Sequence, residues 1–552
     1  MSDTQEVESG VVIGIAFGNT TSSIAYTSAD GKPELIANEE GDRQIPSVLS
    51  YLDSDEFHGG EAKAQLVRNH GNTVAYFRDF LGKKFSEIDP TNAHNSAHPI
   101  DAEGKVSFSV VEKAGKPAVN ITVEEITARH LRRLVSSAAD FLGKPVTKAI
   151  VTVPTDFTEA QRAALTSAAL DANIQILQVI QEPVAEALAY AARDNFQTAD
   201  KVILVADIGG TRTDATVVAV RGGMYTILAT AHDYELGGVR LDATLVDHFA
   251  KEFIKKHKSD PRENQRSLAK LKLECEVVKR TLSIATSASI GIDSLCDGYD
   301  FHSTINRFRY ETIGRPLFDQ IIKLAENVVS KAEIDLLDID EVILAGGSSH
   351  TPKIAQRFES LFPNCTIHAP ATETTALNPS ELAARGAAIQ ASLVSEFDVE
   401  DIDQSTHPMV TVAPHLSKDI GVVIVAADGT ETFQTLLPAQ TAMPARRAAE
   451  FNAPAEGGDV VIKFVEGGSV IKKEIIPPAP KDEDDSDDEE DEPEEVKSKE
   501  MKVEKLLAEA LLKGTEKGQK IEVTVQALEA GELNVTARIV GTQNGVRGQV
   551  KA

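Results

Sequence analysis

The sequence contains three cysteines, no tryptophan and no long apolar segment. Cys275, Cys296 and Cys365 are far apart and lack metal-ligand spacing, which excludes a disulfide framework and a cysteine-based metal site. No apolar run approaches the roughly 20 residues that span a bilayer. The acidic start of the chain, MSDTQEVESG, lacks the basic and apolar regions of a secretion signal. These absences predict a cytoplasmic protein with reduced thiols.

Positive charge is also scarce. The 552 residues include 85 acids against 56 lysines and arginines, for a formal charge of -29. Nucleic acids and anionic membranes are bound by clustered lysine and arginine, so the composition argues against both as direct partners. Residues 482–495 contain twelve acids in fourteen positions and leave -17 for the rest. Such a run cannot bury enough apolar surface to order itself, and we expect a solvated loop there.

The hydrophobic pattern divides the chain into two regions. Up to residue 395, short apolar strands alternate with long amphipathic helices, which predicts an α/β domain; the clearest strands are 11–17, 148–153, 202–207 and 342–345. Residues 396–409 have the composition of a linker. From 410 to 552 the pattern predicts a small all-β domain with strands at 420–426, 460–465, 521–527 and 533–539. The last two strands are joined at a hairpin that contains Gly531.

One segment of the second region has helical spacing. Apolar residues recur at i, i+3, i+4, i+7 and i+8 as Val503, Leu506, Leu507, Ala510 and Leu511. Gly514 follows where a helix cap belongs. We therefore expect an amphipathic helix that packs on its own domain.

Three glycine-rich turns follow predicted strands. They are residues 14–21 (GIAFGNTT), 207–214 (DIGGTRTD) and 345–349 (AGGSS). Glycine lets backbone N–H groups approach an anion, and the hydroxyls add donors. One such turn alone is typical of an ordinary tight hairpin. The three together predict two phosphate-binding hairpins that face each other, with a third turn near a base or ribose.

The order of these and further motifs resembles the DnaK-type, seventy-kilodalton heat-shock chaperone family. The further motifs are VTVP at 151–154, QEP at 181–183, LGG at 236–238, KRTLS at 279–283, IGIDSL at 290–295 and GAA at 386–388. The resemblance implies an α/β actin-like nucleotide-binding domain of two ribonuclease-H-like lobes over 1–395 and a linker over 396–409. A β-type substrate-binding domain over 410–552 would follow. The family normally continues into a helical lid beyond that point, so we expect no lid.

The resemblance also implies an ATP site. On one helix face, Glu276, Lys279, Arg280 and Ser283 match the residues that hold adenine and ribose. Residues that match the family's other nucleotide contacts are Gly18, Asn19, Thr20, Gly209, Gly210, Thr211, Gly237, Gly238, Gly347 and Ser348. His350 stands where the family usually has an arginine near the base, and Ser380 replaces an acid near the ribose.

The residues of hydrolysis depart further from the family. Ala16 replaces an aspartate that orders the Mg²⁺ shell, and Asn19 replaces a phosphate-contacting threonine. Arg78 stands where a lysine orients the nucleophile, and Arg212 replaces a threonine. Glu182, Asp207 and Asp214 are retained. We therefore assign no catalytic residue and no metal ligand, leave Mg²⁺ open, and expect ATP to be held without turnover.

Two hypotheses describe the new arginines. In the first, Arg78 and Arg212 supply part of the metal's charge to the phosphates. In the second, both side chains point to solvent or pair with nearby acids.

Within the family, the FGNT hairpin, the FRDF segment at 77–80, the missing lid and the acidic insert resemble the atypical chaperone subunits of the fungal ribosome-associated complex. This implies a stable heterodimer with a J-domain protein of the zuotin type, attachment to the ribosome through that partner, and assistance to a separate active chaperone during translation. Without a lid, a strand of the partner could complete the β-domain's sheet.

Three other functions remain open. They are an ATP-hydrolysing chaperone that binds clients itself, a nucleotide exchange factor of the large heat-shock type, and a sugar kinase on the same fold. The catalytic substitutions argue against the hydrolysing chaperone. The absent helical C-terminus argues against the exchange factor, and the β-domain argues against the sugar kinase.

Overall fold

The computed structural model divides into two compact units. It describes residues 11–89, 95–193, 199–395, 397–398, 400–402, 414–425, 431–453, 457–476, 494–528, 531–542 and 544–551. The α/β unit comprises residues up to 197, 202–218 and 227–406, and the β unit comprises the remainder. In the described part of the chain, no helix is long and apolar enough to cross a membrane.

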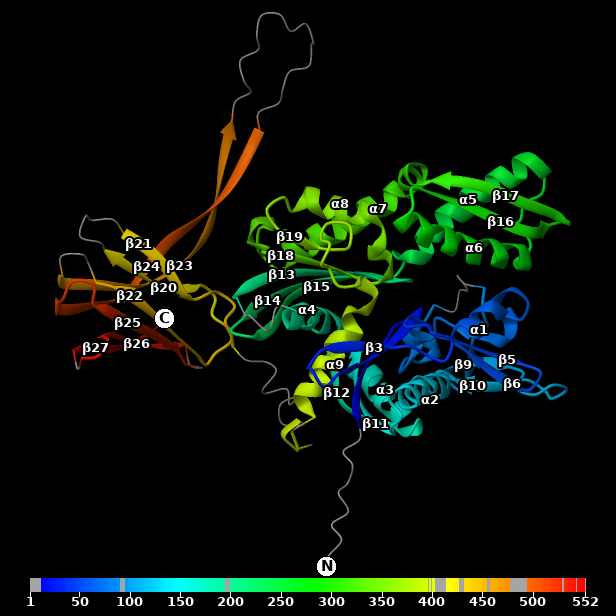
Figure 1. Cartoon of the computed structure of the whole chain (residues 1–552), viewed down its shortest axis with the longest axis horizontal. Helices are drawn as coiled ribbons and strands as arrows, with labels where there is room; N and C mark the ends of the chain where they lie inside the picture. The colour runs from blue at the N-terminus through cyan, green and yellow to red at the C-terminus, as the bar shows by residue number, and fades with distance from the viewer. Residues whose placement is uncertain are drawn as a thin grey trace, which may run out of the picture. The chain divides into compact units, whose positions relative to one another are not determined.

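Lobe I of the α/β unit contains residues 11–193 and 382–394, and is built on one mixed sheet (Figure 1). Its strand order is β12-β11-β1-β2-β3, with β4 beside β2. The strands are β1 (Val11–Phe17), β2 (Thr21–Thr27), β3 (Pro33–Ile36), β4 (Ile45–Pro46), β11 (Val146–Val153) and β12 (Gln175–Gln181). The central β1 pairs parallel to β11 and antiparallel to β2, so the β1–β2 turn projects from the middle of the sheet.

Helices and two small sheets complete lobe I. The helices are α1 (Gly59–Ala64), α2 (Val123–Leu142), α3 (Glu159–Asp171), α4 (Glu182–Arg193) and α9 (Leu382–Val394). The small sheets contain β5 (Val48–Leu52), β6 (Asp55–His58), β7 (Thr73–Ala75), β8 (Pro99–Ala102), β9 (Lys105–Val110) and β10 (Val119–Thr122). Helix α9 packs on β1, and it crosses α4 so closely that a Cβ at Gly386 would lie 1.8 Å from the Ala185 oxygen. Glycine is therefore required at this crossing.

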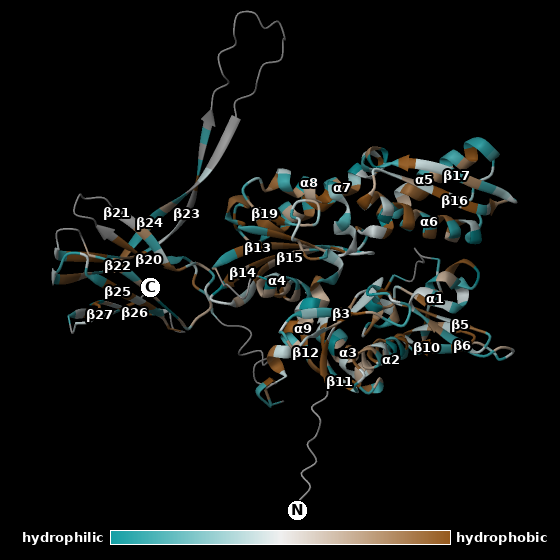
Figure 2. Cartoon of the chain, viewed as in Figure 1, coloured by the Kyte–Doolittle hydropathy of each residue, from teal (hydrophilic) through white to brown (hydrophobic). Residues whose placement is uncertain are grey.

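Lobe II contains residues 202–218 and 227–381, and it repeats the plan with the sheet order β15-β14-β13-β18-β19. Its strands are β13 (Lys201–Ile208), β14 (Thr213–Arg221), β15 (Met224–Asp233), β18 (Glu341–Ala345), β19 (Thr366–His368) and the outer pair β16 (Ser287–Cys296) and β17 (Tyr299–Asn306). Its helices are α5 (Gly238–His257), α6 (Gln265–Ile284), α7 (Arg307–Lys331) and α8 (Pro352–Leu361). Figure 2 colours β13 and β11 mainly brown, as expected for strands buried on both faces.

The β unit is a sandwich of two four-stranded sheets around one apolar core. One sheet has the order β21-β20-β23-β24, with β20 (Asp419–Val425), β21 (Glu431–Leu437), β23 (Gly458–Ile476) and β24 (Glu494–Thr515). The other has the order β22-β25-β26-β27, with β22 (Ala445–Asn452), β25 (Lys520–Ala527), β26 (Glu532–Ile539) and β27 (Gly545–Lys551). Buried and less buried residues alternate along β26, as a two-layer sandwich requires.

The strands predicted in both units are confirmed. Their ends move by at most two residues, except that the strand predicted at 460–465 extends to Ile476 in β23. The helix predicted around 503–511 is wrong. That segment lies in β24, which pairs antiparallel with β23 from Glu494 to Thr515. Three residues of the predicted stripe, Val503, Leu506 and Leu511, are 42%, 51% and 44% exposed. The other two differ: Ala510 is buried and Leu507 packs against the core of the β unit. Long-range pairing with β23 therefore overrides a spacing that is helical by coincidence.

Neighbouring leucines of β24 provide a test of this correction. We expect Leu512→Ala, at a fully buried position, to lower the stability of the sheet by about 2–5 kcal/mol. Leu511→Ala, on the exposed face, should cost less than about 1 kcal/mol. Hydrogen exchange of the β23 amides measures both. A larger loss for Leu511→Ala would contradict the strand and favour a helix.

Most of two predicted segments lies outside the described residues. Residues 482–493 of the acidic insert are among these, while 494–495 begin β24. Of the predicted linker, only 397–398 and 400–402 are described. Within it, Ile402 is buried and packs with Ala391 and Val394 of α9.

Candidate functional site

A cavity of 470 Å³ lies between the two lobes, and this volume is typical of a small-molecule site. It is lined by the β1–β2 turn, the β13–β14 turn, the turn after β18 and one face of α6. The predicted residues in the lining are Ala16, Gly18, Asn19, Thr20, Arg78, Glu182, Asp207, Gly209, Gly210, Thr211, Arg212, Asp214, Gly238, Glu276, Lys279, Arg280, Ser283, Gly347, Ser348, His350 and Ser380. Gly237 lies outside the lining and caps the start of α5.

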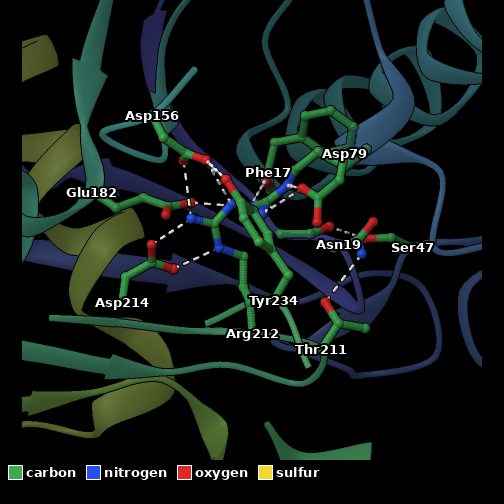
Figure 3. Close-up of polar contacts among 12 residues, drawn as sticks. Phe17, Asn19, Ser47, Asp79, Asp156, Glu182, Thr211, Arg212, Asp214 and Tyr234 are labelled. Carbon is green, nitrogen blue, oxygen red and sulfur yellow. Dashed lines mark hydrogen bonds and ion pairs between the residues drawn. The ribbon is translucent and has the colours of Figure 1, made fainter. Parts of the chain in front are cut away.

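The two glycine-rich turns meet at their tips. A Cβ at Gly210 would lie 2.4 Å from Cγ2 and 2.5 Å from Oγ1 of Thr20, so only glycine allows this approach. Asn19 Nδ2 donates to Thr211 Oγ1 at 3.1 Å, which joins the turns directly (Figure 3). Asn19 Oδ1 is buried and has no hydrogen-bond partner in the described structure. An unpaired acceptor beside a glycine-rich cradle fits a ligand that supplies a donor or a cation.

The predicted face of α6 forms one wall of the cavity and is held by ion pairs. Lys279 Nζ donates to the Gly238 oxygen and to Asp242 Oδ2, both at 2.9 Å. Glu276 accepts from Lys63 of lobe I at 2.7 Å and from Arg280 at 2.6 Å. The Lys63–Glu276 pair links the two lobes across the cavity.

His350 lies at the base of the third turn. Its Nε2 donates to Asn378 Oδ1 at 3.0 Å, and this oxygen also accepts from the Ser380 amide. Burial lowers the pKa of His350, although Asn378 opposes the shift. Ser348 Oγ donates to the Gly209 oxygen at 2.9 Å and so ties the third turn to the second.

The acidic floor of the cavity contains both new arginines. Figure 3 shows Arg212 among its acidic partners. Arg78 Nη1 donates to Glu182 and to the Phe17 oxygen, each at 3.2 Å, and its Nε donates to Asp79 at 2.8 Å. Arg212 Nε donates to Asp214 Oδ2 at 2.7 Å. The side chains of Arg78 and Arg212 are only 5% and 6% exposed.

Comparisons with known proteins agree with this geometry. Residues 12–454 match the family described as "Hsp70 protein". The chain belongs to the Hsp70 family. Its paired lobes are consistent with the actin-like ATPase fold, and Hsp70 proteins generally bind ATP with Mg²⁺.

Two fungal relatives match this Hsp70 chain along almost all of their length. The ribosome-associated complex subunit SSZ1 of Saccharomyces cerevisiae is 43% identical over 98% of this chain and 100% of the relative. A heat shock protein 70 homologue of Schizosaccharomyces pombe is 44% identical over 98% of this chain and 95% of the relative. The heat shock 70 kDa protein 14-A of Xenopus laevis is 34% identical over 84% of this chain and 89% of the relative. The names of these relatives support a chaperone role, and one of them belongs to a ribosome-associated complex.

The arginines of this Hsp70 chain pair with acids, as the second hypothesis proposed, although neither points to solvent. Arg78 engages Glu182 and Arg212 engages Asp214, which are two of the three retained carboxylates. Each guanidinium charge is therefore directed at a carboxylate of the protein. The first hypothesis, that the arginines stand in for the metal's charge, receives no support from these contacts.

Acids still outnumber bases in the floor. Burial raises the pKa of Glu182 to about 8, although Arg78 opposes the shift. Burial and the nearby Asp214 raise the pKa of Asp207 to about 6. Burial, with Asp207 and Glu182 nearby, raises the pKa of Glu186 well above its usual range. The folded state therefore binds more protons than the unfolded state above the usual carboxyl pKa, and stability falls as the pH rises through these values.

Glu186→Gln tests this excess of acid. At pH 8 we expect the variant to unfold at a higher temperature than the wild type, because ionisation of the buried Glu186 carboxyl destabilises the wild type. At pH 5 the two unfolding temperatures should differ little. Thermal unfolding at both pH values measures the effect. Glu159→Gln, on the solvent-exposed start of α3, is the control and should show no such dependence. An equal gain at both pH values for Glu186→Gln would indicate a packing effect instead.

Several residues of the site were not predicted from the sequence. Lys63, Asp156, Tyr234 and Asp242 each contact a predicted residue through a side chain. They come from separate elements and share no motif or spacing. The position of Tyr234, two residues before the LGG motif, was the one local signal available.

Proposed function

We propose that this Hsp70 chain is an atypical ATP-binding chaperone subunit that holds ATP without hydrolysing it. Residues 1–395 would form the nucleotide-binding domain, and residues 410–552 would form a β-type substrate-binding domain. Residues 396–409 would link the two domains. The protein would work in the cytoplasm, pair stably with a J-domain protein of the zuotin type, and assist co-translational folding by another chaperone.

The observation that carries the proposal is the occupation of the acidic floor by Arg78 and Arg212. Phosphoryl transfer depends on groups that position a metal and an attacking water. Here Glu182 and Asp214 are engaged by guanidinium groups, and Ala16 supplies no carboxylate. The nucleoside side keeps Lys279, Glu276 and Arg280 around the cavity. Groups that could bind a nucleoside thus line the cavity. Two carboxylates that could organise hydrolysis are instead paired with arginines.

Nucleotide content tests the binding part of the proposal. The chain is purified without added nucleotide, divided, and desalted with or without EDTA. We expect intact ATP on the protein in both portions, since Arg78 and Arg212 already pair with Glu182 and Asp214, two carboxylates whose charge a metal would otherwise offset. Recovery of ADP alone would contradict the proposal. Loss of ATP only with EDTA would show that Mg²⁺ is required for retention.

The partner segment would add to the edge of the β unit. In the described structure β24 ends its sheet and pairs only with β23. Its exposed apolar residues, Met501, Val503, Leu506 and Leu511, stand between charged ones such as Lys502 and Glu504. Exposed apolar residues on an unpaired edge strand favour the addition of another strand. A strand from the J-domain protein could cover this edge by β-augmentation.

A lysine on β24 tests this interface. We expect Val503→Lys to weaken the complex with the J-domain protein by about tenfold or more, because a charge on an edge strand opposes strand addition. Val546→Lys, on the edge strand β27 of the other sheet, is matched in type and exposure, at 39% against 42%, and should leave the complex intact. Co-purification and titration calorimetry measure both. Equal binding by the two variants would count against β24 as the docking strand.

Charge supports attachment through a partner. With a formal charge of -29, the chain is poorly suited to grip ribosomal RNA directly. The S. cerevisiae relative is named as a subunit of a ribosome-associated complex. We therefore propose that the ribosome is reached through the basic surface of the J-domain protein.

A further inference from the structure

One carboxylate of lobe I receives two donors from lobe II. Asp156 follows β11 in lobe I, whereas Arg212 lies in the β13–β14 turn and Tyr234 directly after β15 (Figure 3). Arg212 Nη2 donates to Asp156 Oδ1 at 2.9 Å, and the Tyr234 hydroxyl donates to Asp156 Oδ2. Both oxygens of Asp156 are thus used across the boundary between the lobes.

Arg212 is held firmly within this arrangement. Its Nε and Nη2 both donate to the carboxylate of Asp214, which makes this pair bidentate. Nη2 also donates to Asp156. The Tyr234 ring lies against it, with 4.6 Å between the ring centroid and Cζ of Arg212. A planar guanidinium that is stacked and doubly hydrogen-bonded has little freedom to rotate away.

The ionisation of the three groups favours their contacts at neutral pH. Burial and the hydrogen bond to Asp156 raise the pKa of Tyr234 to about 12, which keeps its hydroxyl a donor. Burial would raise the pKa of Asp156, but the hydrogen bond from Tyr234 and the charge of Arg212 outweigh it and lower the pKa. The carboxylate therefore stays ionised until the medium becomes strongly acidic.

The cluster differs in position from two links between the lobes that lie in the cavity. The Arg193–Glu373 pair is a further link outside the cavity lining. The Asn19–Thr211 and Lys63–Glu276 contacts are made by residues that line the cavity, where a bound nucleotide would compete for them. Asp156 and Tyr234 are not part of that lining, although both contact Arg212, which is. A nucleotide can therefore enter or leave without replacing either of them as a partner.

We propose that Asp156, Arg212 and Tyr234 form a latch that holds the two lobes closed whether or not a nucleotide is bound. Lobe closure then depends on the chain's own residues, and a nucleotide that has entered is released slowly. The latch goes beyond the proposed function, because it requires neither ATP binding nor the absence of hydrolysis.

The distance between the lobes tests the latch. Spin labels are placed on cysteines introduced by Glu61→Cys on α1 and Val277→Cys on α6, two solvent-exposed sites on opposite sides of the cavity. In the nucleotide-free wild type we expect one short distance that ATP does not change. In Tyr234→Phe and Asp156→Asn, the nucleotide-free distances should lengthen and broaden. ATP release from the same variants should accelerate about tenfold or more.

Tyr299→Phe is the matched control. Its ring is 51% exposed against 52% for Tyr234, and it lies in the same lobe, away from the cavity. It should behave as the wild type in both measurements, and cooperative thermal unfolding of each variant shows that it remains folded. The latch is overturned if the nucleotide-free wild type opens as far as Tyr234→Phe, or if Tyr234→Phe and Asp156→Asn stay closed. Because the distances are measured without nucleotide, they decide the latch even if the chain proves not to retain ATP.

Discussion

Gly210→Ala should raise the Kd for ATP by roughly 10- to 100-fold, or about 1.4–2.8 kcal/mol. The reason is steric: a Cβ at this position would lie 2.4–2.9 Å from three side-chain atoms of Thr20. Threonine is short and branched, so it cannot turn aside cheaply. The two hairpins would have to separate, and their N–H groups would no longer converge on the phosphates.

Gly71→Ala is the control for this prediction. Gly71 is an exposed residue of lobe I, and a Cβ there meets nothing within 4 Å. The same chemical change should therefore leave the Kd within about twofold. Calorimetric titration of both variants with ATP decides the matter. Wild-type affinity in Gly210→Ala would mean that the two hairpins do not enclose the phosphates.

Arg212→Ala should lower the local free energy of unfolding by about 3–5 kcal/mol, because it leaves two carboxylates without their charged partner. The Arg212 side chain is only 6% exposed, and it bridges Asp214 and Asp156. Removal of one member of a largely buried cluster costs more than removal of a surface ion pair, since the remaining carboxylates are only partly solvated. Hydrogen exchange of the β13 and β14 amides, in the nucleotide-free protein, measures the change.

Arg315→Ala provides the contrast. Arg315 also faces an aspartate, Asp319, but its side chain is 74% exposed. A solvated pair of this kind contributes about 0–1 kcal/mol. A similar loss in both variants would mean that the Arg212 cluster is no more than a surface network, and the assignment of a structural role to it would be wrong.

The sequence allowed much of the fold to be predicted where the signal is local. Strands such as Val11–Phe17 and Glu341–Ala345 follow from short apolar runs that end in glycine, and the glycine-rich turns follow from residue type. The segment containing Leu511 and Leu512 could not be assigned correctly, because its partner strand β23 decides which face is buried.

The candidate site shows the same division. Motif positions such as Lys279 and Gly210 line the cavity as expected. The partners of Arg78 and Arg212 could not be predicted, because Glu182, Asp214 and Asp156 reach them through the fold and not through spacing along the chain. The acidic insert lies largely outside the described residues, so its solvated conformation stays a prediction, as does the absence of a lid.

Single-turnover hydrolysis tests the central claim most directly. The purified chain, in excess, is mixed with Mg²⁺ and ATP labelled at the γ-phosphate, and samples are quenched over an hour beside an ATP-hydrolysing Hsp70 protein. The arrangement of Arg78 and Arg212 on the retained carboxylates predicts that the label stays in ATP on the protein. Stoichiometric release of phosphate within minutes would contradict it.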